Sequence, residues 1–118
     1  MKVRLFAVLA AAVLAAGCGP ATNYKYRIAV IPKGMTHEFW QSIHRGADRA
    51  AEDLTKQGVP VFVEFKGPAK ESDSLEQIDL LKTEATSGFN GIVLAPQDSK
   101  AMVKPVESVV AKGVPVLI

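Results

Sequence analysis

The sequence has one cysteine, Cys18, and two histidines among its 118 residues. A single cysteine excludes a disulfide framework within the chain. The histidines, His37 and His44, lie seven residues apart without thiols or carboxylates at metal-ligand spacing. We therefore expect neither a metal site nor a cofactor.

Motifs that support nucleotide binding or hydrolysis are also missing. No Gly-x-Gly-x-x-Gly follows the first predicted strand, and no phosphate loop ends in Gly-Lys-Ser or Gly-Lys-Thr. The Gly-x-Ser-x-Gly pattern of a hydrolase does not occur. We expect a binding protein without catalytic residues rather than an enzyme.

No apolar run of membrane-spanning length opens the chain, but a shorter one does. Residues 5–16 are twelve consecutive apolar residues after a basic start, whereas a spanning helix needs about 20. This is the layout of a secretory signal peptide. We predict a signal peptide at 1–17, a tether at 18–25 and a folded domain at 26–118.

Neither charge sign is in excess once the predicted signal peptide is left out of the count. Without Lys2 and Arg4, which belong to the predicted signal peptide, twelve basic residues face twelve acidic ones. Net charge therefore gives no reason to expect nucleic acid as a partner.

What the chain does contain is a repeated strand and helix pattern. Apolar runs at 26–31, 59–65, 91–95 and 114–118 predict four strands that are covered on both faces. The helices between them are expected to end at Gly58, Gly88 and Gly113. This alternation predicts an α/β fold with a doubly wound parallel sheet.

Finer features of the helices follow from capping and periodicity. The predicted N-caps are Thr36, then Ser72 or Asp73, then Asp98 or Ser99. Pro105 either bends the third helix or marks its start after a loose turn. Gln77 and Asp79 are expected on the outer surface of the second helix. The predicted inward residues are Phe39, Ile43, Ala47, Ala50, Leu54, Leu75, Ile78, Leu81, Ala85, Met102, Val106, Val109 and Val110.

The last predicted strand has no helix after it. This predicts a chain truncated after the fourth strand, with one sheet face partly bare and marginal stability.

The loop after the first strand is the expected place for a ligand, because ligands of open parallel sheets bind beyond the carboxyl ends of the strands. The candidates there are Lys33, His37, Phe39 and Trp40. Phe39 is shared between core and ligand, whereas Trp40, about 100° further round the helix, is expected to face the cleft more openly.

Several motifs together resemble the amino-terminal lobe of type I periplasmic sugar-binding proteins, which serve ABC importers and include ribose, rhamnose and autoinducer binders. These motifs are Ile31-Pro32-Lys33, Phe39-Trp40, Gly67-Pro68 and residues 91–99. The resemblance implies that the aromatic pair stacks on a sugar and that Lys33 reaches it. Where many members have an asparagine before the pair, this chain has Thr36-His37-Glu38.

The third turn adds Gln97 and Asp98 as further candidates. Asp98 either accepts hydrogen bonds from ligand hydroxyls or caps the third helix. Ala15-Ala16-Gly17-Cys18 resembles a bacterial lipobox, with Leu14 one place further from the cysteine than the pattern prefers. That resemblance implies a lipid anchor at Cys18 after cleavage, with release of the cleaved protein as the alternative.

We therefore predict an exported solute-binding lipoprotein of the periplasm or cell envelope, which carries a sugar-like molecule to an ABC permease. One alternative is a periplasmic sensing domain that partners a membrane receptor or kinase. Another is an exported α/β enzyme.

Overall fold

A computed structural model describes residues 23–118 of the chain. The predicted signal peptide, Cys18 and most of the predicted tether lie outside the described residues.

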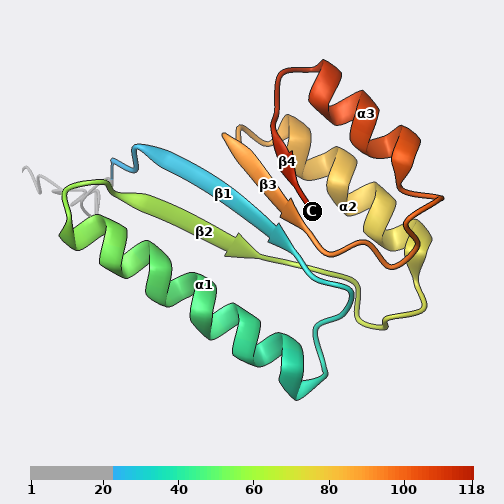
Figure 1. Cartoon of the computed structure of the whole chain (residues 1–118), viewed down its shortest axis with the longest axis horizontal. Helices are drawn as coiled ribbons and strands as arrows, with labels where there is room; N and C mark the ends of the chain where they lie inside the picture. Colours follow the sequence, from blue (N-terminus) through green and yellow to red (C-terminus); the bar gives the residue numbers. More distant parts are fainter. Residues whose placement is uncertain (1–22) are drawn as a thin grey trace, which may run out of the picture.

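Within residues 23–118, four strands and three helices alternate, as predicted (Figure 1). All paired strands are parallel, and their order in the sheet is β2-β1-β3-β4. The elements are β1 (Tyr26–Ile31), α1 (Glu38–Lys56), β2 (Val61–Phe65), α2 (Ser74–Thr86), β3 (Gly91–Leu94), α3 (Val103–Ala111) and β4 (Val116–Leu117).

The main core lies on the sheet face that α2 and α3 cover. Side chains alternate between faces along a strand, so Ala29 and Ile31 share this face with Ile92 and Leu94 of the neighbouring strand. All four are at most 2% exposed. Leu81 from α2, Phe89 from the turn before β3, and Met102 and Val109 from the α3 region complete the cluster.

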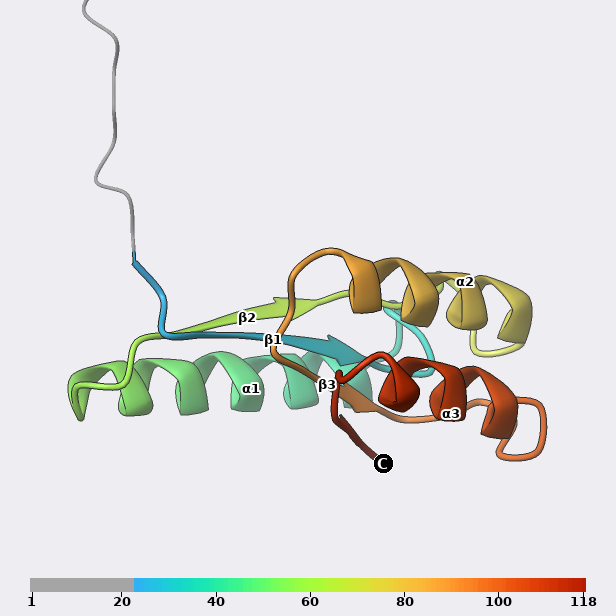
Figure 2. The same cartoon turned by 90° about the horizontal axis from the view of Figure 1, so that it is seen from above.

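The opposite sheet face is only partly covered. Figure 2 shows α1 and α2 on opposite sides of the sheet. The contacts of α1 with the sheet are made with β2, where His44 stacks on Phe65 at 4.3 Å. Val30 and Val93 lie on the same face beyond α1 and are only half-buried, and Leu117 there is 66% exposed. The α1 face is therefore open on its β1, β3 and β4 side, which agrees with the prediction that one sheet face is partly bare, although the apolar strands alone predicted cover on both faces.

The helix ends confirm most of the predicted caps. Gly58, Gly88 and Gly113 follow the three helices with positive φ, as left-handed helix ends require. Asp73 caps α2 by accepting the N–H of Glu76 at 3.0 Å.

Of two further predictions about where the helices start, one is wrong and one is confirmed. The predicted cap Thr36 is wrong, because α1 begins one residue later and His37 is its N-cap. The reading of Pro105 as the mark of a late start is confirmed, since a turn over residues 98–102 precedes α3.

The predicted inward residues are buried at Leu81, Met102 and Val109. The prediction is wrong on α1 for Phe39, Ile43 and Leu54, which are 56%, 42% and 40% exposed. It is also wrong for Leu75 and Val110, which are 74% and 50% exposed.

Candidate functional site

A hollow of about 450 Å³ lies where the sequence places the site, beyond the carboxyl ends of β1 and β3. Small-molecule sites commonly span about 300–1,000 Å³, so a monosaccharide is of suitable size. Its lining residues are Val30, Ile31, Pro32, Lys33, Phe39, Trp40, Ile43, Val93, Leu94, Ala95, Pro96 and Ile118.

Phe39 and Trp40 meet at this hollow in a T-shaped pair, with ring centroids 4.9 Å apart and planes at 81°. Their burial is the reverse of the prediction. Trp40 is 9% exposed, whereas Phe39 is the open ring at 56%. Helical spacing alone assigned Phe39 to the core, but it could not show that α1 covers only β2 and leaves this side of the helix open.

A hydrogen bond satisfies the polar N–H of the buried Trp40 ring. Its indole Nε1 donates to Oε1 of Glu71, from the loop between β2 and α2, at 2.6 Å. That loop also passes close to Gly34, where an added Cβ would lie 2.8 Å from Cγ of Glu71. Glu71 is thus a residue of the site region that the sequence analysis missed, and no local pattern marks it.

Lys33 is half-buried and lines the hollow, directly after the buried Pro32. The ion pairs formed within residues 23–118 do not include its ammonium group. A lysine ammonium can donate up to three hydrogen bonds, so Lys33 can serve several acceptor oxygens in the hollow.

Gln77 is a clear correction to the sequence analysis. It was expected on the outer surface of α2, yet it is 0% exposed. The side chain lies between the ends of β1 and β3, where polar backbone groups need partners. The position in fact shares the buried side of α2 with Leu81 and Glu84, at helical spacings of four and three, and this pattern could have indicated burial. Asp79 is exposed, as expected.

Gln97 also lies beside the hollow, but its side chain is bonded to backbone. Its Nε2 donates to the carbonyls of Lys33 and Lys70, and its Oε1 is buried without a hydrogen-bond partner among the described residues. Direct contact between Gln97 and a ligand stays a prediction.

His37 and Asp98 are both exposed and both support local backbone turns. Nδ1 of His37 accepts the N–H of Phe39 at 3.1 Å. Asp98 accepts the N–H groups of Lys100 at 2.8 Å and Ala101 at 3.0 Å, so it orders the turn before α3. The prediction that Asp98 or Ser99 caps the third helix is wrong, because the N-cap of α3 is Met102 and no side chain caps it. The hydrogen bond from Ala101, followed by that from Lys100, lowers the pKa of the Asp98 carboxyl, because both favour the charged form.

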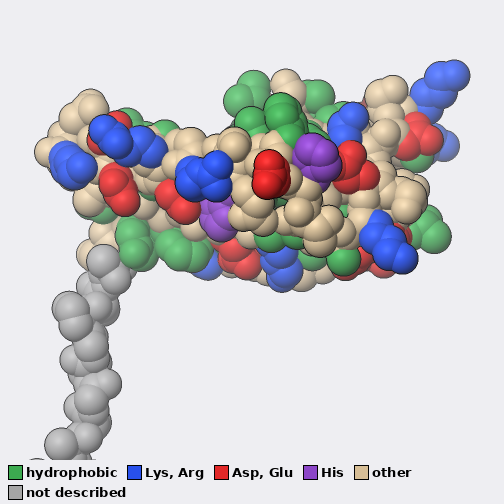
Figure 3. Space-filling model, turned by 90° about the horizontal axis from the view of Figure 1, so that it is seen from below, with side chains coloured by type: hydrophobic (Ala, Val, Ile, Leu, Met, Phe, Trp, Pro, Cys, Tyr) green, Lys and Arg blue, Asp and Glu red, His purple; other side chains and the backbone are tan. Residues whose placement is uncertain are grey.

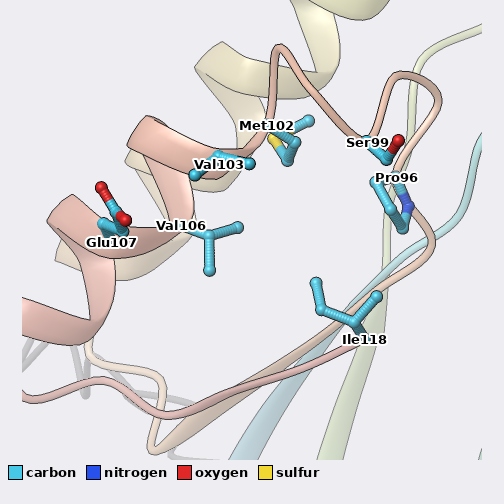
Figure 4. Close-up of a pocket in the computed structure, with 7 residues that line it drawn as sticks. All are labelled: Pro96, Ser99, Met102, Val103, Val106, Glu107 and Ile118. Carbon is cyan, nitrogen blue, oxygen red and sulfur yellow. The ribbon is translucent and has the colours of Figure 1, made fainter.

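A second hollow of about 280 Å³ adjoins the first, and the two share Pro96 and Ile118 (Figure 4). Figure 4 shows Val106 of α3 and Ile118 pointing into it. Its lining is largely apolar, with Ser99 and Glu107 as the polar residues.

The surface carries both charge signs. Figure 3 shows Lys and Arg side chains interspersed with Asp and Glu rather than gathered in one patch. Pairs such as Arg49 with Asp53 on α1 contribute to this mixing. Across residues 23–118, no helix combines the length and apolar character that crossing a membrane requires.

Solved structures place this arrangement in one fold class. The chain superposes with a TM-score of 0.70 on an ABC transporter solute-binding protein from Agrobacterium vitis bound to α-D-tagatopyranose, at 27% identity over 78% of this chain and 29% of that one. A carbohydrate transporter solute-binding protein from Agrobacterium radiobacter in complex with D-arabinose gives 0.67, at 35% identity over 77% of this chain and 29% of that one. The fold is that of a type I periplasmic binding protein, as the sequence predicted.

The sequence comparisons give the family. The profile of the periplasmic binding protein domain matches residues 28–118. A D-ribose/D-allose-binding protein of Pseudomonas aeruginosa is 30% identical over 96 residues, which are 81% of this chain and 29% of that protein. The chain belongs to the periplasmic binding protein domain family. It spans about three tenths of the length of the relatives that it matches.

Proposed function

We propose that the chain forms one wall of a sugar-binding cleft in an exported solute-binding protein of an ABC importer. The observation that carries this proposal is the hollow at the carboxyl edge, where the open ring of Phe39 and the ammonium of Lys33 line the same space. The names of the relatives, which describe sugar binding and transport, support it.

The two side chains suit the two surfaces of a sugar. An aromatic ring covers the C–H face of a pyranose or furanose, while a lysine donates hydrogen bonds to the oxygens at its rim. No bond of the sugar is made or broken in this role. Trp40 contributes the inner part of the aromatic wall. His37 and Asp98 are exposed and do not line the hollow, so their contact with the ligand stays a prediction.

The test is a titration of the chain with D-ribose, D-allose, D-arabinose and D-tagatose, followed by NMR. Trp40 is the only tryptophan, so its indole N–H signal reports on the hollow. We expect saturable shifts with a Kd of about 1 mM or weaker, because these residues contact a sugar from one side only.

Variants locate the binding. Phe39→Ala is expected to abolish the saturable shifts and Lys33→Met to weaken binding measurably without abolishing it, whereas Lys56→Met, at the far end of α1, leaves the shifts unchanged. Absence of a saturable shift with all four sugars would contradict the proposed site, and sub-millimolar binding would contradict its one-sided character.

We also propose that residues 1–17 are removed as a signal peptide and that Cys18 then anchors the protein to the cell envelope beside an ABC permease. The lipobox-like Ala15-Ala16-Gly17-Cys18 supports this. In a bacterial host fed labelled palmitate, the wild-type chain is expected to take up label and Cys18→Ser none. An unlabelled wild-type protein that is still cleaved would overturn the anchor and leave secretion in place.

A further inference from the structure

Two glutamines join the loops that follow β1, β2 and β3. Nε2 of the buried Gln77 donates to the carbonyls of Pro32 and Ala95, both at 2.9 Å. Its Oε1 accepts the backbone N–H of Gln97, also at 2.9 Å. A rotated amide would set its oxygen against two carbonyl oxygens, so only this orientation satisfies all the groups.

Gln97 extends the connection toward the ligand side. Its side-chain amide donates to the carbonyl of Lys33, and at 3.1 Å to the carbonyl of Lys70 in the loop after β2. The backbone of residues 32 and 33 is therefore held by both glutamines. The Lys33 side chain leaves this held backbone and lines the hollow.

We propose that Gln77 and Gln97 are positioning residues that do not contact the ligand: Gln77 holds the backbone at Pro32 and Gln97 holds it at Lys33, at the wall of the cleft. This inference rests on the proposed function. A lysine side chain loses considerable freedom when it binds, and a mobile backbone would add to that cost. Holding the backbone in advance leaves only the side chain to be ordered.

The first test needs no ligand. Hydrogen exchange of the Gln97 backbone N–H reports directly on its bond to Gln77. In Gln77→Met, which keeps the side-chain length without the amide, we expect this exchange to rise about tenfold or more over wild type. The amide of Leu81, in the same helix, is expected to change much less. Gln57→Met, at the exposed end of α1, is the matched control and leaves both amides unchanged.

Gln77→Glu adds a pH-dependent measurement that a loss of packing alone would not change. Its carboxylate would face two carbonyl oxygens, whereas the protonated acid can donate to one of them. Burial raises the pKa of a carboxyl group, so protonation is reached at a higher pH than for an exposed glutamate. The ratio of Gln97 exchange between variant and wild type is therefore expected to fall as the pH is lowered, unlike the ratio for Gln77→Met.

Three results would overturn the proposal that Gln77 and Gln97 hold the loops. One is an equal response of Gln77→Met and Gln57→Met, and the second is acceleration of Gln97 and Leu81 by the same factor. The third is a pH-independent ratio for Gln77→Glu. If the Gln77 variants do not fold, the same readings on the Lys33 and Lys70 loops in Gln97→Met decide the matter, because Gln97 is only half-buried.

The second test uses the sugar that binds. Gln97→Met is expected to weaken binding about fivefold, and adding it to Lys33→Met causes no further loss, since it acts through Lys33. Additive losses would mean direct contact by Gln97 and would overturn the inference. If wild type binds no sugar, the proposed function fails, while the exchange measurements still decide whether the glutamines hold the loops.

Discussion

Asp98 shows how one exposed carboxylate orders the chain between β3 and α3. Helix α3 has no side-chain cap of its own, because its N-cap residue is Met102. The turn before it is ordered instead by Asp98, which accepts two backbone N–H groups. This turn begins two residues after Pro96, which lines the hollow, so the carboxylate supports one margin of the candidate site.

The lowered pKa of Asp98 makes this support depend on pH. A carboxyl whose folded pKa is lowered stabilises the fold above its ordinary pKa, and this contribution is lost as the pH falls through the lowered value. We expect Asp98→Asn to lose thermal stability at neutral pH and to approach wild type at strongly acidic pH. Thermal unfolding followed by circular dichroism across this range measures the effect. Parallel curves for the two proteins at every pH would contradict it.

At the scale of elements, the close approach of the loops after β1 and β2 shapes the floor of the site. A Cβ on Gly67 would lie 2.7 Å from Cγ and 2.9 Å from Cδ of Pro32. Pro32 is buried, so its ring has little room to move away from a side chain at position 67.

We predict that Gly67→Ala destabilises the chain by about 1–3 kcal/mol, because the added methyl group overpacks this contact. Gly46→Ala is the matched control. Gly46 lies inside α1 with no atom within 4 Å of an added Cβ, and alanine there is expected to stabilise by about 0.5–1 kcal/mol. Urea unfolding measures both, and effects of the same sign would contradict the structure.

A second connection between elements is the ion pair of Lys66, after β2, with Glu84 of α2. Nζ and Oε1 are 3.1 Å apart, and the Glu84 side chain is 4% exposed against 48% for Lys66. The hydrogen bond to Glu84, together with its charge, raises the pKa of Lys66. The pair therefore stabilises the fold below the ordinary lysine pKa, and this stability is lost as the pH rises through the raised value.

Lys66→Met would leave a buried carboxylate without its cation. We expect a loss of about 1–3 kcal/mol, toward the lower value because water still reaches the lysine side. Replacing both partners, in Lys66→Met with Glu84→Leu, is expected to recover much of it. Lys82→Met on the exposed side of α2 serves as control. Urea unfolding that shows equal losses for Lys66→Met and Lys82→Met would argue against the pair.

The whole molecule is defined by its unevenly covered sheet. The α2 and α3 face holds the main core, whereas the other face is open beside α1. Leu117, on edge strand β4, is part of this open apolar surface. Open apolar surface and an unpaired strand edge both favour association.

We therefore expect residues 23–118 to be marginally stable and to self-associate as concentration rises, and Leu117→Lys to reduce association. Sedimentation and thermal unfolding over a range of concentrations test this. A cooperative, reversible transition of a monomer, unchanged by Leu117→Lys, would contradict it.

The sequence by itself determined the order of elements and the parallel winding, and it predicted the edge of the sheet where the hollow lies. These features follow from periodicity, glycine at helix ends and the handedness of βα units, all of which are local or nearly local. Lys33 at the carboxyl edge was likewise predictable, because its strand was.

Only the tertiary structure decided which side chains are exposed to solvent and which are buried or hydrogen-bonded. Trp40 is buried and Phe39 is exposed, the reverse of the prediction, because the burial of each α1 side chain depends on where the helix lies on the sheet. Gln77 is polar and was expected outside, but the ends of β1 and β3 bring two carbonyl groups to it. Those groups are 45 and 18 residues away in the chain, and no local pattern records such distant partners.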